Sequence, residues 1–379
     1  MNFKIPLFDL NYGREEEYQI LKTIRSKWIS MGQNVKQLED DFAKHLTIDH
    51  AVALTNGTVS LHLALKVLGI GEGDEVIVPS LTFVATVNVV RYVGATPIFA
   101  DVTSFEDFSI DPEDIGNKIT SNTKALIVMH YAGFACNMDE IMRIAKEHDL
   151  FVIEDAAHAP DSEYKDKKLG TIGDIGCFSF FSNKNISCAE GGILATDNSE
   201  YAKRAKLLRS HGMISLSERR DEGCRQQYDI SELGYNYRMD DIRGALARAQ
   251  LRKLEDDTNK RKALRNCYLE SLSFIKDIFI PYKDFKYQSS NHIMPIVLKN
   301  CDAKKRDGVR HYLAESGIQT SVHYPAVHKF SLYDKYKSYL PKTEYIADCE
   351  ITLPLFYNLT KDEIKYISLK IGSALNKIR

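Results

Sequence analysis

The stretch Ala51-Val-Ala-Leu54-Thr-Asn-Gly57-Thr58-Val-Ser-Leu-His-Leu-Ala-Leu65 contains the first clear structural pattern in the chain. Its apolar beginning, residues 51–54, is typical of a buried strand, and the segment from Val59 to Leu68 is typical of a helix. A glycine turn joins the two. A strand, a tight turn and a helix in this order predict a crossover unit, and crossover units build parallel sheets.

The same alternation continues to about residue 210. We expect further strands at residues 75–78, 96–100, 124–129 and 151–153, and helices at residues 82–92 and 139–148. This order predicts an α/β fold with a mainly parallel sheet. Ligands of such sheets bind at the carboxyl ends of the strands, so we expect the chemistry just after Leu54, Val78, Met129 and Ile153.

The pattern changes near Met239. Residues 239–273 are helical and charged, which predicts one long helix or a broken pair, and a strand at 291–298 and helices at 302–316 and 361–377 follow. We therefore predict a large domain at residues 14–245 and a smaller C-terminal α+β domain at residues 246–379. The N-terminal segment, residues 1–13, is expected to pack on the small domain.

Composition restricts the class of protein. The 379 residues are 44% hydrophobic and 27% charged, which is typical of a globular protein, and the formal net charge of −2 gives no reason to expect a nucleic-acid partner. We see neither a signal peptide nor a membrane span. The seven cysteines are scattered without a Cys-x-x-Cys pair, so we expect no zinc site, no disulfide framework and a cytoplasmic location.

Two glycine motifs lie near the predicted strand ends. Gly57 and Thr58 stand between a strand and a helix, where unpaired N–H groups and the helix dipole suit a phosphate. An ordinary turn with Thr58 as helix cap is the alternative. Gly69-Ile-Gly71-Glu-Gly73 resembles a dinucleotide fingerprint, but it follows a helix and precedes a strand, which is the wrong order.

Lys184 lies between two apolar runs, Cys177–Phe181 and Ile193–Thr196. A lysine held between buried strands loses its proton more easily than a free lysine, and a neutral amine can form a Schiff base with an aldehyde cofactor. The alternative is a lysine whose ammonium group simply reaches solvent.

Asp155 ends an apolar strand, so its carboxylate is expected in the ligand crevice. There it could keep a cofactor's pyridine nitrogen protonated, or it could cap a helix. His158 could donate to a ring oxygen or be a core histidine. Phe83, just past another strand, could stack on a flat ring or pack in the core.

Two loops carry further candidates. Asn236 and Arg238 alternate with aromatic residues and could serve a ligand, a neighbouring subunit or only solvent. His323 and Tyr324, beside a proline and followed by His328, suggest a substrate-contacting loop. No carboxylate stands at helical spacing from these histidines, so we predict no metal site.

Taken in order, several motifs resemble the DegT-like (DegT/DnrJ/StrS type) pyridoxal-phosphate sugar aminotransferases of fold type I. The resemblance runs from Ile5 to Leu355 and rests on the combination of motifs, since each alone is weak. It implies a seven-stranded, mainly parallel sheet flanked by helices, with a smaller C-terminal domain. The motifs are Thr55-Asn-Gly-Thr58, Pro79-Ser-Leu-Thr-Phe83-Val-Ala-Thr86, His130-Tyr-Ala-Gly133, Glu154-Asp155-Ala-Ala-His158-Ala, Phe178-Ser179-Phe, Asn183-Lys184-Asn, Glu190-Gly-Gly192 and Gly234-Tyr-Asn236-Tyr-Arg238.

The resemblance assigns roles residue by residue. Lys184 matches the lysine that holds pyridoxal 5'-phosphate as an internal aldimine, and Asp155 matches the partner of the pyridinium nitrogen. His158 matches the polar residue beside the ring hydroxyl, and Phe83 matches the stacking aromatic residue. The phosphate cradle corresponds to Gly57, Thr58 and Ser179. Asn236 matches an asparagine that reaches the cofactor phosphate of the other protomer, which implies a homodimer with shared active sites.

The activity implied is amino transfer from L-glutamate or glutamine to a nucleotide-linked keto sugar. Such reactions supply amino sugars for lipopolysaccharide, other surface polysaccharides or natural products. Members that act as dehydratases carry histidine in place of Lys184, so the lysine disfavours that branch. Arg238, His323 and Tyr324 are expected to contact substrate.

Locally, His130-Tyr-Ala-Gly133 and Asn185–Gly192 resemble the branch that forms UDP-4-amino-4-deoxy-L-arabinose. That branch usually has tryptophan in place of Phe83 and differs at residues 215–225, so its substrate is not transferred to this chain. A keto-cyclitol aminotransferase of the aminoglycoside type and a catalytically silent cofactor-binding sensor remain alternatives. A nucleotide-dependent oxidoreductase would need a fingerprint after the first strand, which this chain lacks.

Overall fold

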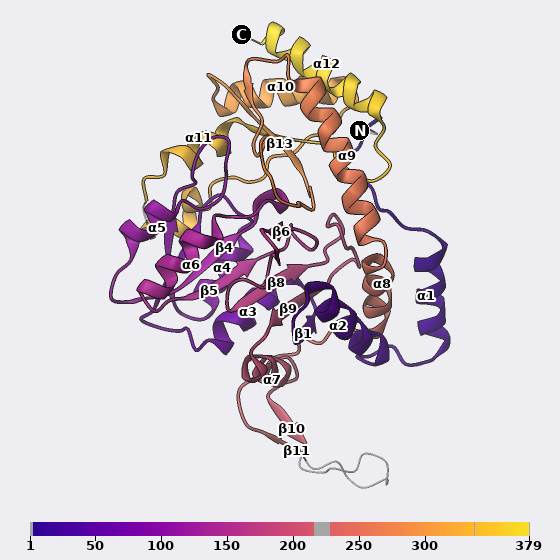
Figure 1. The fold of residues 1–379 in the computed structure, drawn as a ribbon, viewed down its shortest axis with the longest axis vertical. Helices are drawn as coiled ribbons and strands as arrows, with labels where there is room; N and C mark the ends of the chain where they lie inside the picture. Colours follow the sequence, from indigo (N-terminus) through magenta and orange to yellow (C-terminus); the bar gives the residue numbers. More distant parts are fainter. Residues whose placement is uncertain (1–2, 216–227, 337, 379) are drawn as a thin grey trace.

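The computed structural model describes residues 3–215, 228–336 and 338–378 (Figure 1). Its centre is a seven-stranded sheet with the order β1-β9-β8-β5-β4-β2-β3. Only β9 runs against its neighbours, and the other six strands point the same way. The strands are β1 (His50–Leu54), β2 (Glu75–Pro79), β3 (Thr96–Ala100), β4 (Thr123–Met129), β5 (Phe151–Asp155), β8 (Ile175–Ser179) and β9 (Gly192–Thr196).

Helices cover both faces of this sheet because its strands are apolar on both sides. One face packs against α3 (Gly57–Val67), α4 (Ala85–Tyr92) and α7 (Ser199–Leu208). The other face packs against α2 (Gln33–Leu46), α5 (Pro112–Lys118), α6 (Met138–Glu147) and α8 (Asp241–Leu251). The outer helix α1 (Arg14–Arg25) lies against α8 at the right edge of Figure 1.

A second, smaller sheet has its own core at the top of Figure 1. It is antiparallel and contains β12 (Ile278–Phe279), β13 (Met294–Leu298) and β14 (Glu350–Leu353). Its helices are α9 (Leu254–Leu272), α10 (Ala303–Glu315), α11 (Pro341–Cys349) and α12 (Lys361–Lys377). Ile5 pairs with Ile318 and is buried in this core, so this residue of the N-terminal segment packs on the smaller sheet's unit.

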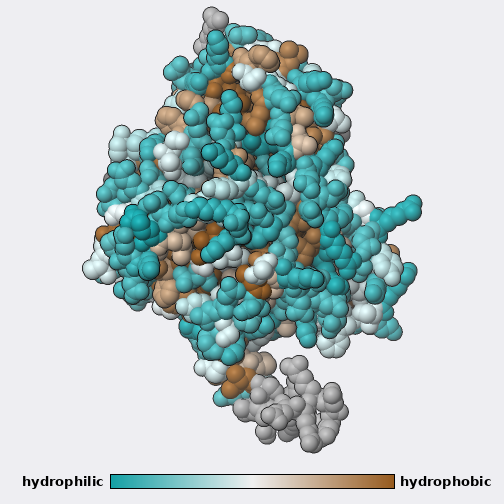
Figure 2. Space-filling model, viewed as in Figure 1, coloured by the Kyte–Doolittle hydropathy of each residue, from teal (hydrophilic) through white to brown (hydrophobic). Residues whose placement is uncertain are grey.

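Short elements complete the fold. The hairpin of β10 (Met213–Ser215) and β11 (Tyr228–Ile230) projects below α7 in Figure 1. Hydrophilic residues cover most of the face in Figure 2, and apolar residues reach the surface where this hairpin leaves the body. The remaining elements are β6 (Glu163–Tyr164), β7 (Lys167–Lys168), and the 3₁₀ turns η1 (Tyr131–Gly133), η2 (Val327–Lys329) and η3 (Ser331–Tyr336).

The predicted fold class is confirmed, and the differences are local. The helical region after Met239 is a broken pair, α8 and α9. The helix expected at 82–92 begins only at Ala85, because the chain bends at residues 80–82 and turns at Val84 after β2 ends at Pro79. The predicted domain boundary at 245/246 cuts through α8 and stays a prediction. No helix of the described residues is long and apolar enough to cross a membrane.

Candidate active site

A cavity of about 630 Å³ lies at the carboxyl ends of β1, β2, β4, β5 and β8. This is the edge of the sheet at which the sequence predicted the chemistry. All predicted site residues except Asn236 and Arg238 line it, namely Gly57, Thr58, Phe83, Asp155, His158, Ser179, Lys184, His323 and Tyr324. Residues separated by more than 260 positions in the sequence therefore meet in one cavity.

The N-terminus of α3 forms one wall. Asn56 caps the helix by accepting a hydrogen bond from Val59 N at 3.0 Å. Among the described residues, the N–H groups of Gly57 and Thr58 have no hydrogen-bond partner. A Cβ on Gly57 would stand 2.7 Å from Ser179 Cβ, so only glycine lets the helix approach β8 this closely. The wall therefore presents free donors, the helix dipole and the Ser179 hydroxyl to an anion.

Lys184 faces this wall from the loop that follows β8. Burial lowers the pKa of Lys184 to about 8, and the negative charge of Asp155 opposes that shift. An ordinary lysine keeps its proton up to about pH 10. At neutral pH the cavity therefore contains a lysine with an appreciable fraction of neutral, nucleophilic amine.

Asp155 is fixed at the end of β5. One carboxylate oxygen accepts a hydrogen bond from Thr86 Oγ1 at 2.8 Å, and the other accepts from Ala157 N at 3.2 Å. Burial raises the pKa of Asp155, and these two hydrogen bonds and Lys184 oppose the rise. The Thr86 contact was missed at the sequence level, although a threonine in the first turn after a strand end could have indicated it.

His158 joins two parts of the cavity. Its Nδ1 accepts a hydrogen bond from Ala132 N at 3.2 Å, so the neutral ring carries its proton on Nε2, 3.0 Å from Tyr324 Oη. Burial lowers the pKa of His158, and the nearby charge of Lys184 lowers it further. Phe83 remains 55% exposed and tilts toward Tyr324, so its ring offers a face to the cavity.

His323 enters the cavity from the loop before η2 and has two buried partners that the sequence did not suggest. Its Nδ1 lies 2.9 Å from Thr352 Oγ1, and its backbone N donates to Glu350 Oε2 at 2.8 Å. The available signal was Glu350 itself, a carboxylate inside the apolar run Cys349–Leu353.

Asn236 and Arg238 lie apart from the cavity wall. Asn236 is exposed and bridges to Ser210, and Arg238 bridges to Leu54 at the end of β1. Between them, Tyr235 and Tyr237 stack with ring centroids 4.8 Å apart. Within one chain, the structure therefore does not bring these two predicted residues to the site.

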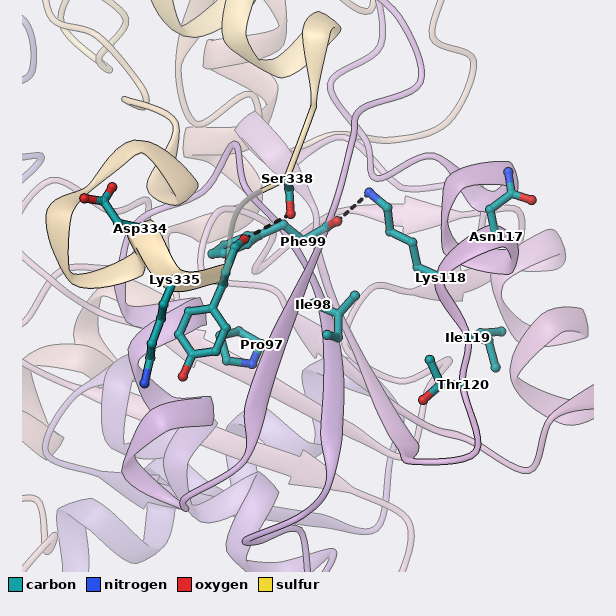
Figure 3. Close-up of a pocket in the computed structure, with 11 residues that line it drawn as sticks. Pro97, Ile98, Phe99, Asn117, Lys118, Ile119, Thr120, Asp334, Lys335 and Ser338 are labelled. Carbon is teal, nitrogen blue, oxygen red and sulfur yellow. Dashed lines mark hydrogen bonds between the residues drawn. The ribbon is translucent and has the colours of Figure 1, made fainter.

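Another hollow, of about 500 Å³, lies beside the edge strand β3 (Figure 3). Lys118, one of the charged groups that line it, donates to Phe99 O and Asp114. The hollow contains none of the predicted site residues. In the described part of the chain, no group of three or more His, Cys, Asp or Glu residues is placed to hold a metal ion.

Comparison with known proteins identifies the family. The model of the DegT/DnrJ/EryC1/StrS aminotransferase family matches residues 11–371. The chain belongs to this family. It is 37% identical to GDP-perosamine synthase of Escherichia coli O157:H7 over 97% of this chain and 98% of that protein. It is 35% identical to the spore coat polysaccharide biosynthesis protein SpsC of Bacillus subtilis, with 96% and 94% covered.

The fold agrees with solved members of the family. The PLP form of Spr1654 from Streptococcus pneumoniae superposes with a TM-score of 0.91 at 28% identity, covering 100% of this chain and 99% of that chain. The protein is therefore a sugar aminotransferase of fold type I that uses pyridoxal phosphate. The predictions of family, enzyme class and cofactor are confirmed.

The cavity's own groups suit this cofactor. The free N–H groups of Gly57 and Thr58 match a phosphate, and Lys184 matches an aldehyde. The buried Asn183 Oδ1 has no hydrogen-bond partner among the described residues, and Asn183 lines the same cavity. An unpaired buried oxygen is costly, which is consistent with a bound group that completes the site.

Proposed function

We propose that this enzyme transfers the amino group of L-glutamate, or glutamine, to a nucleotide-linked keto sugar in amino-sugar biosynthesis. One observation carries the proposal: Lys184, Asp155 and the N-terminus of α3 line a single cavity at the strand ends. The relatives named for GDP-perosamine and for spore coat polysaccharide support a nucleotide sugar as acceptor and a surface polysaccharide as destination. Such precursors are made in the cytoplasm, which we propose as its location.

Seven residues would hold the cofactor. Lys184 Nζ would bond to its aldehyde carbon, and Asp155 would keep the pyridine nitrogen protonated. Gly57, Thr58 and Ser179 bind the phosphate. Phe83 would offer its ring to the cofactor ring, and His158 would donate from Nε2, which lies beside Tyr324 Oη, to the ring hydroxyl. When bound, the cofactor stores the amino group of the first substrate and delivers it to the second.

The chain's own contribution to the chemistry is proton transfer. Once the substrate amine has displaced it, Lys184 Nζ is free beside Asp155 and can remove the proton from the donor's Cα. Its lowered pKa suits it to act as a base near neutral pH. The keto acid would leave by hydrolysis, with water supplying its carbonyl oxygen. In the second half-reaction Lys184 would give a proton to the acceptor carbon that receives the amino group.

We further propose that the working unit is a homodimer. Asn236 is exposed and lies outside its own cavity, so it is available to reach the cofactor phosphate of a second copy. Arg238, His323 and Tyr324 are proposed to contact the substrate. A shared site of this kind would make catalysis depend on assembly.

The test separates the two halves of the reaction. The cofactor-loaded enzyme is mixed with L-glutamate, and 2-oxoglutarate release is measured; we expect one equivalent per site. The aminated enzyme is then offered a panel of nucleotide-linked keto sugars, free keto sugars and keto-cyclitols. Recovery of the starting absorbance spectrum identifies the acceptor.

The outcomes are distinct. Recovery of the spectrum with a nucleotide-linked keto sugar supports the proposal. Recovery only with a keto-cyclitol would show that the acceptor is a keto-cyclitol instead. Failure with every acceptor after a normal first half-reaction would indicate a silent sensor. Borohydride reduction followed by mass spectrometry should locate the cofactor on Lys184, and the Lys184→Ala variant should show no such adduct.

A further inference from the structure

Behind His323 lies a buried chain of hydrogen bonds that leads away from the cavity. Thr352 Oγ1 lies 2.9 Å from His323 Nδ1 and also contacts Glu350 Oε1. Glu350 Oε2 accepts from the backbone N of His323 at 2.8 Å. Glu350 and Thr352 are completely buried in β14, and His323 is 9% exposed. A closed ring therefore connects the carboxyl group to the imidazole.

The distances allow two arrangements of the protons in this ring. The backbone N–H of His323 can only donate, so Glu350 Oε2 must accept. With Glu350 ionised, Thr352 donates to Oε1 and accepts from His323 Nδ1–H, which leaves a lone pair on Nε2. With Glu350 neutral, its proton stays on Oε1 and Thr352 donates to Nδ1, which places the ring proton on Nε2.

His323 Nε2 is the ring atom left for a ligand. His323 lines the cavity, and no other group of the described residues hydrogen-bonds to Nε2. Burial lowers the pKa of His323 to about 3, with a further contribution from the charge of Lys184, so the ring is neutral and its tautomer decides its role. One tautomer accepts a hydrogen bond in the cavity, and the other donates one.

We propose that Glu350 and Thr352 are positioning residues that set the tautomer of His323, so that neutral Glu350 makes Nε2–H a hydrogen-bond donor to a substrate oxygen. This inference rests on the proposed function, because both substrates offer such an oxygen: the donor's carboxylate and the acceptor's ketone. Ionisation of Glu350 turns Nε2 into an acceptor and removes this contact.

The surroundings of Glu350 favour its neutral form near pH 7. Burial raises the pKa of Glu350 to about 8, while its hydrogen bonds and two distant arginines oppose the rise. Arg306 donates to Ala347 O and Arg310 to Thr320 O, so neither pairs with it in the described structure. The other titratable groups that face it are Tyr131 and Tyr324, both of raised pKa, and His323.

The variant Glu350→Gln tests the ring directly. The backbone N–H of His323 holds the amide oxygen, so the amide NH₂ must face Thr352 Oγ1, which forces Thr352 to donate to Nδ1. The variant thus fixes the neutral arrangement. Thr352→Ser keeps the hydroxyl and is the matched control, and Thr352→Val removes it.

The readout is ¹⁵N NMR of the full-length enzyme labelled at histidine, with the His323 signal assigned by its loss in His323→Gln. In the wild type and in Thr352→Ser we expect the proton to move from Nε2 to Nδ1 as pH rises through about 8. In Glu350→Gln it should stay on Nε2. A wild-type tautomer that is constant from pH 6 to 10, or an equal shift in Glu350→Gln, would overturn the proposal.

The substrate contact is tested by the two half-reactions. Between pH 7 and 9 the ratio of kcat/KM for Glu350→Gln over wild type should rise about tenfold, since one unit above its pKa only about a tenth of Glu350 stays neutral. If the ratio rises with glutamate alone, Nε2–H contacts the donor's carboxylate. If it rises with the keto substrate alone, Nε2–H contacts the acceptor's ketone. A flat ratio in both, with the NMR shift intact, would overturn the contact. In an enzyme that is inactive with every acceptor, the NMR experiment would still show the tautomer of His323. Failure of the proposed function can therefore be told apart from failure of this inference.

Discussion

At the scale of single residues, two opposing effects set the pKa of Lys184. Burial removes solvation from its ammonium group and lowers its pKa to about 8, and the negative charge of Asp155 limits the shift. This intermediate pKa suits the role that we propose for Lys184, a nucleophile in one step and a proton carrier in another. Thr86 completes the arrangement because its hydrogen bond, at 2.8 Å, holds the Asp155 carboxylate in place.

The pKa of Lys184 predicts how the cofactor attaches. Only the neutral amine attacks an aldehyde, so the rate of covalent attachment to cofactor-free enzyme should rise with pH and level off above about 8. An ordinary lysine would give a rate that keeps rising to about pH 10. Stopped-flow absorbance after mixing with pyridoxal phosphate measures this rate. A continued rise beyond pH 9 would contradict the prediction.

The raised pKa of Glu350 predicts that the stability of the fold depends on pH. Its folded-state pKa, about 8, is raised above the unfolded value of 4.5, so the favourable contribution of its proton is complete below pH 4.5 and lost by pH 8. Relative to Glu350→Gln, the wild type should lose up to about 5 kcal/mol of unfolding free energy across this range. Denaturant unfolding of both proteins at several pH values measures the difference, and parallel curves would refute it.

Sequence reasoning found some of these residues and missed others for a physical reason. Asp155 and Lys184 could be predicted as candidates because one ends an apolar strand and the other follows one, and strand ends of a parallel sheet meet at one edge. Glu350 and Thr352 act through His323, which lies 27 and 29 positions away in the chain. Their contact depends on how a loop packs against β14, and no local pattern encodes that packing.

At the scale of elements, the close approach of α3 to β8 builds the wall that we propose binds the cofactor phosphate. Gly57 permits it, since an added Cβ would collide with Ser179. The strand–turn–helix order made this wall predictable. The reversed direction of β9 was not predictable, because a short apolar run has the same pattern in either direction.

Substituting Gly57 tests this wall. In Gly57→Ala the new Cβ must displace the start of α3 or Ser179, so we expect the cofactor's Kd to rise at least about tenfold. Gly116→Ala is the matched control, since Gly116 lies inside α5 and a Cβ added there would meet no atom within 4 Å. It should leave Kd unchanged and stabilise the fold by about 0.5–1 kcal/mol. Equal cofactor affinity in both variants would refute the role of Gly57.

At the scale of the whole molecule, two exposed features are not explained by contacts within one chain. Asn236 is exposed away from its cavity, and the outer face of α1 exposes Tyr18, Leu21 and Ile24, with Trp28 just beyond its end. Large apolar side chains gathered on one helix commonly mark an interface. A second copy that covers α1 and receives Asn236 would account for both features.

Leu21 tests the interface. It is 48% exposed on α1, and burying a leucine contributes roughly 1.5–3 kcal/mol, twice over in a two-fold dimer. Leu21→Lys should therefore weaken the dimer at least about tenfold in sedimentation equilibrium. Leu369→Lys, at a 66% exposed leucine on α12, should leave assembly unchanged. Equal effects of the two variants would place the interface elsewhere.

Subunit mixing tests whether the active sites are shared. Lys184→Ala removes the covalent anchor within its own cavity, whereas Asn236→Ala removes a group that we propose to act in the partner's cavity. Each variant alone should be nearly inactive. After the two are mixed and allowed to exchange subunits, half of the dimers are mixed, and each mixed dimer contains one site with both native residues. Activity should recover to about one quarter of the wild-type value, with random pairing in a two-fold dimer. If Asn236 served its own cavity instead, no site in the mixed dimer would be complete, and mixing would restore nothing.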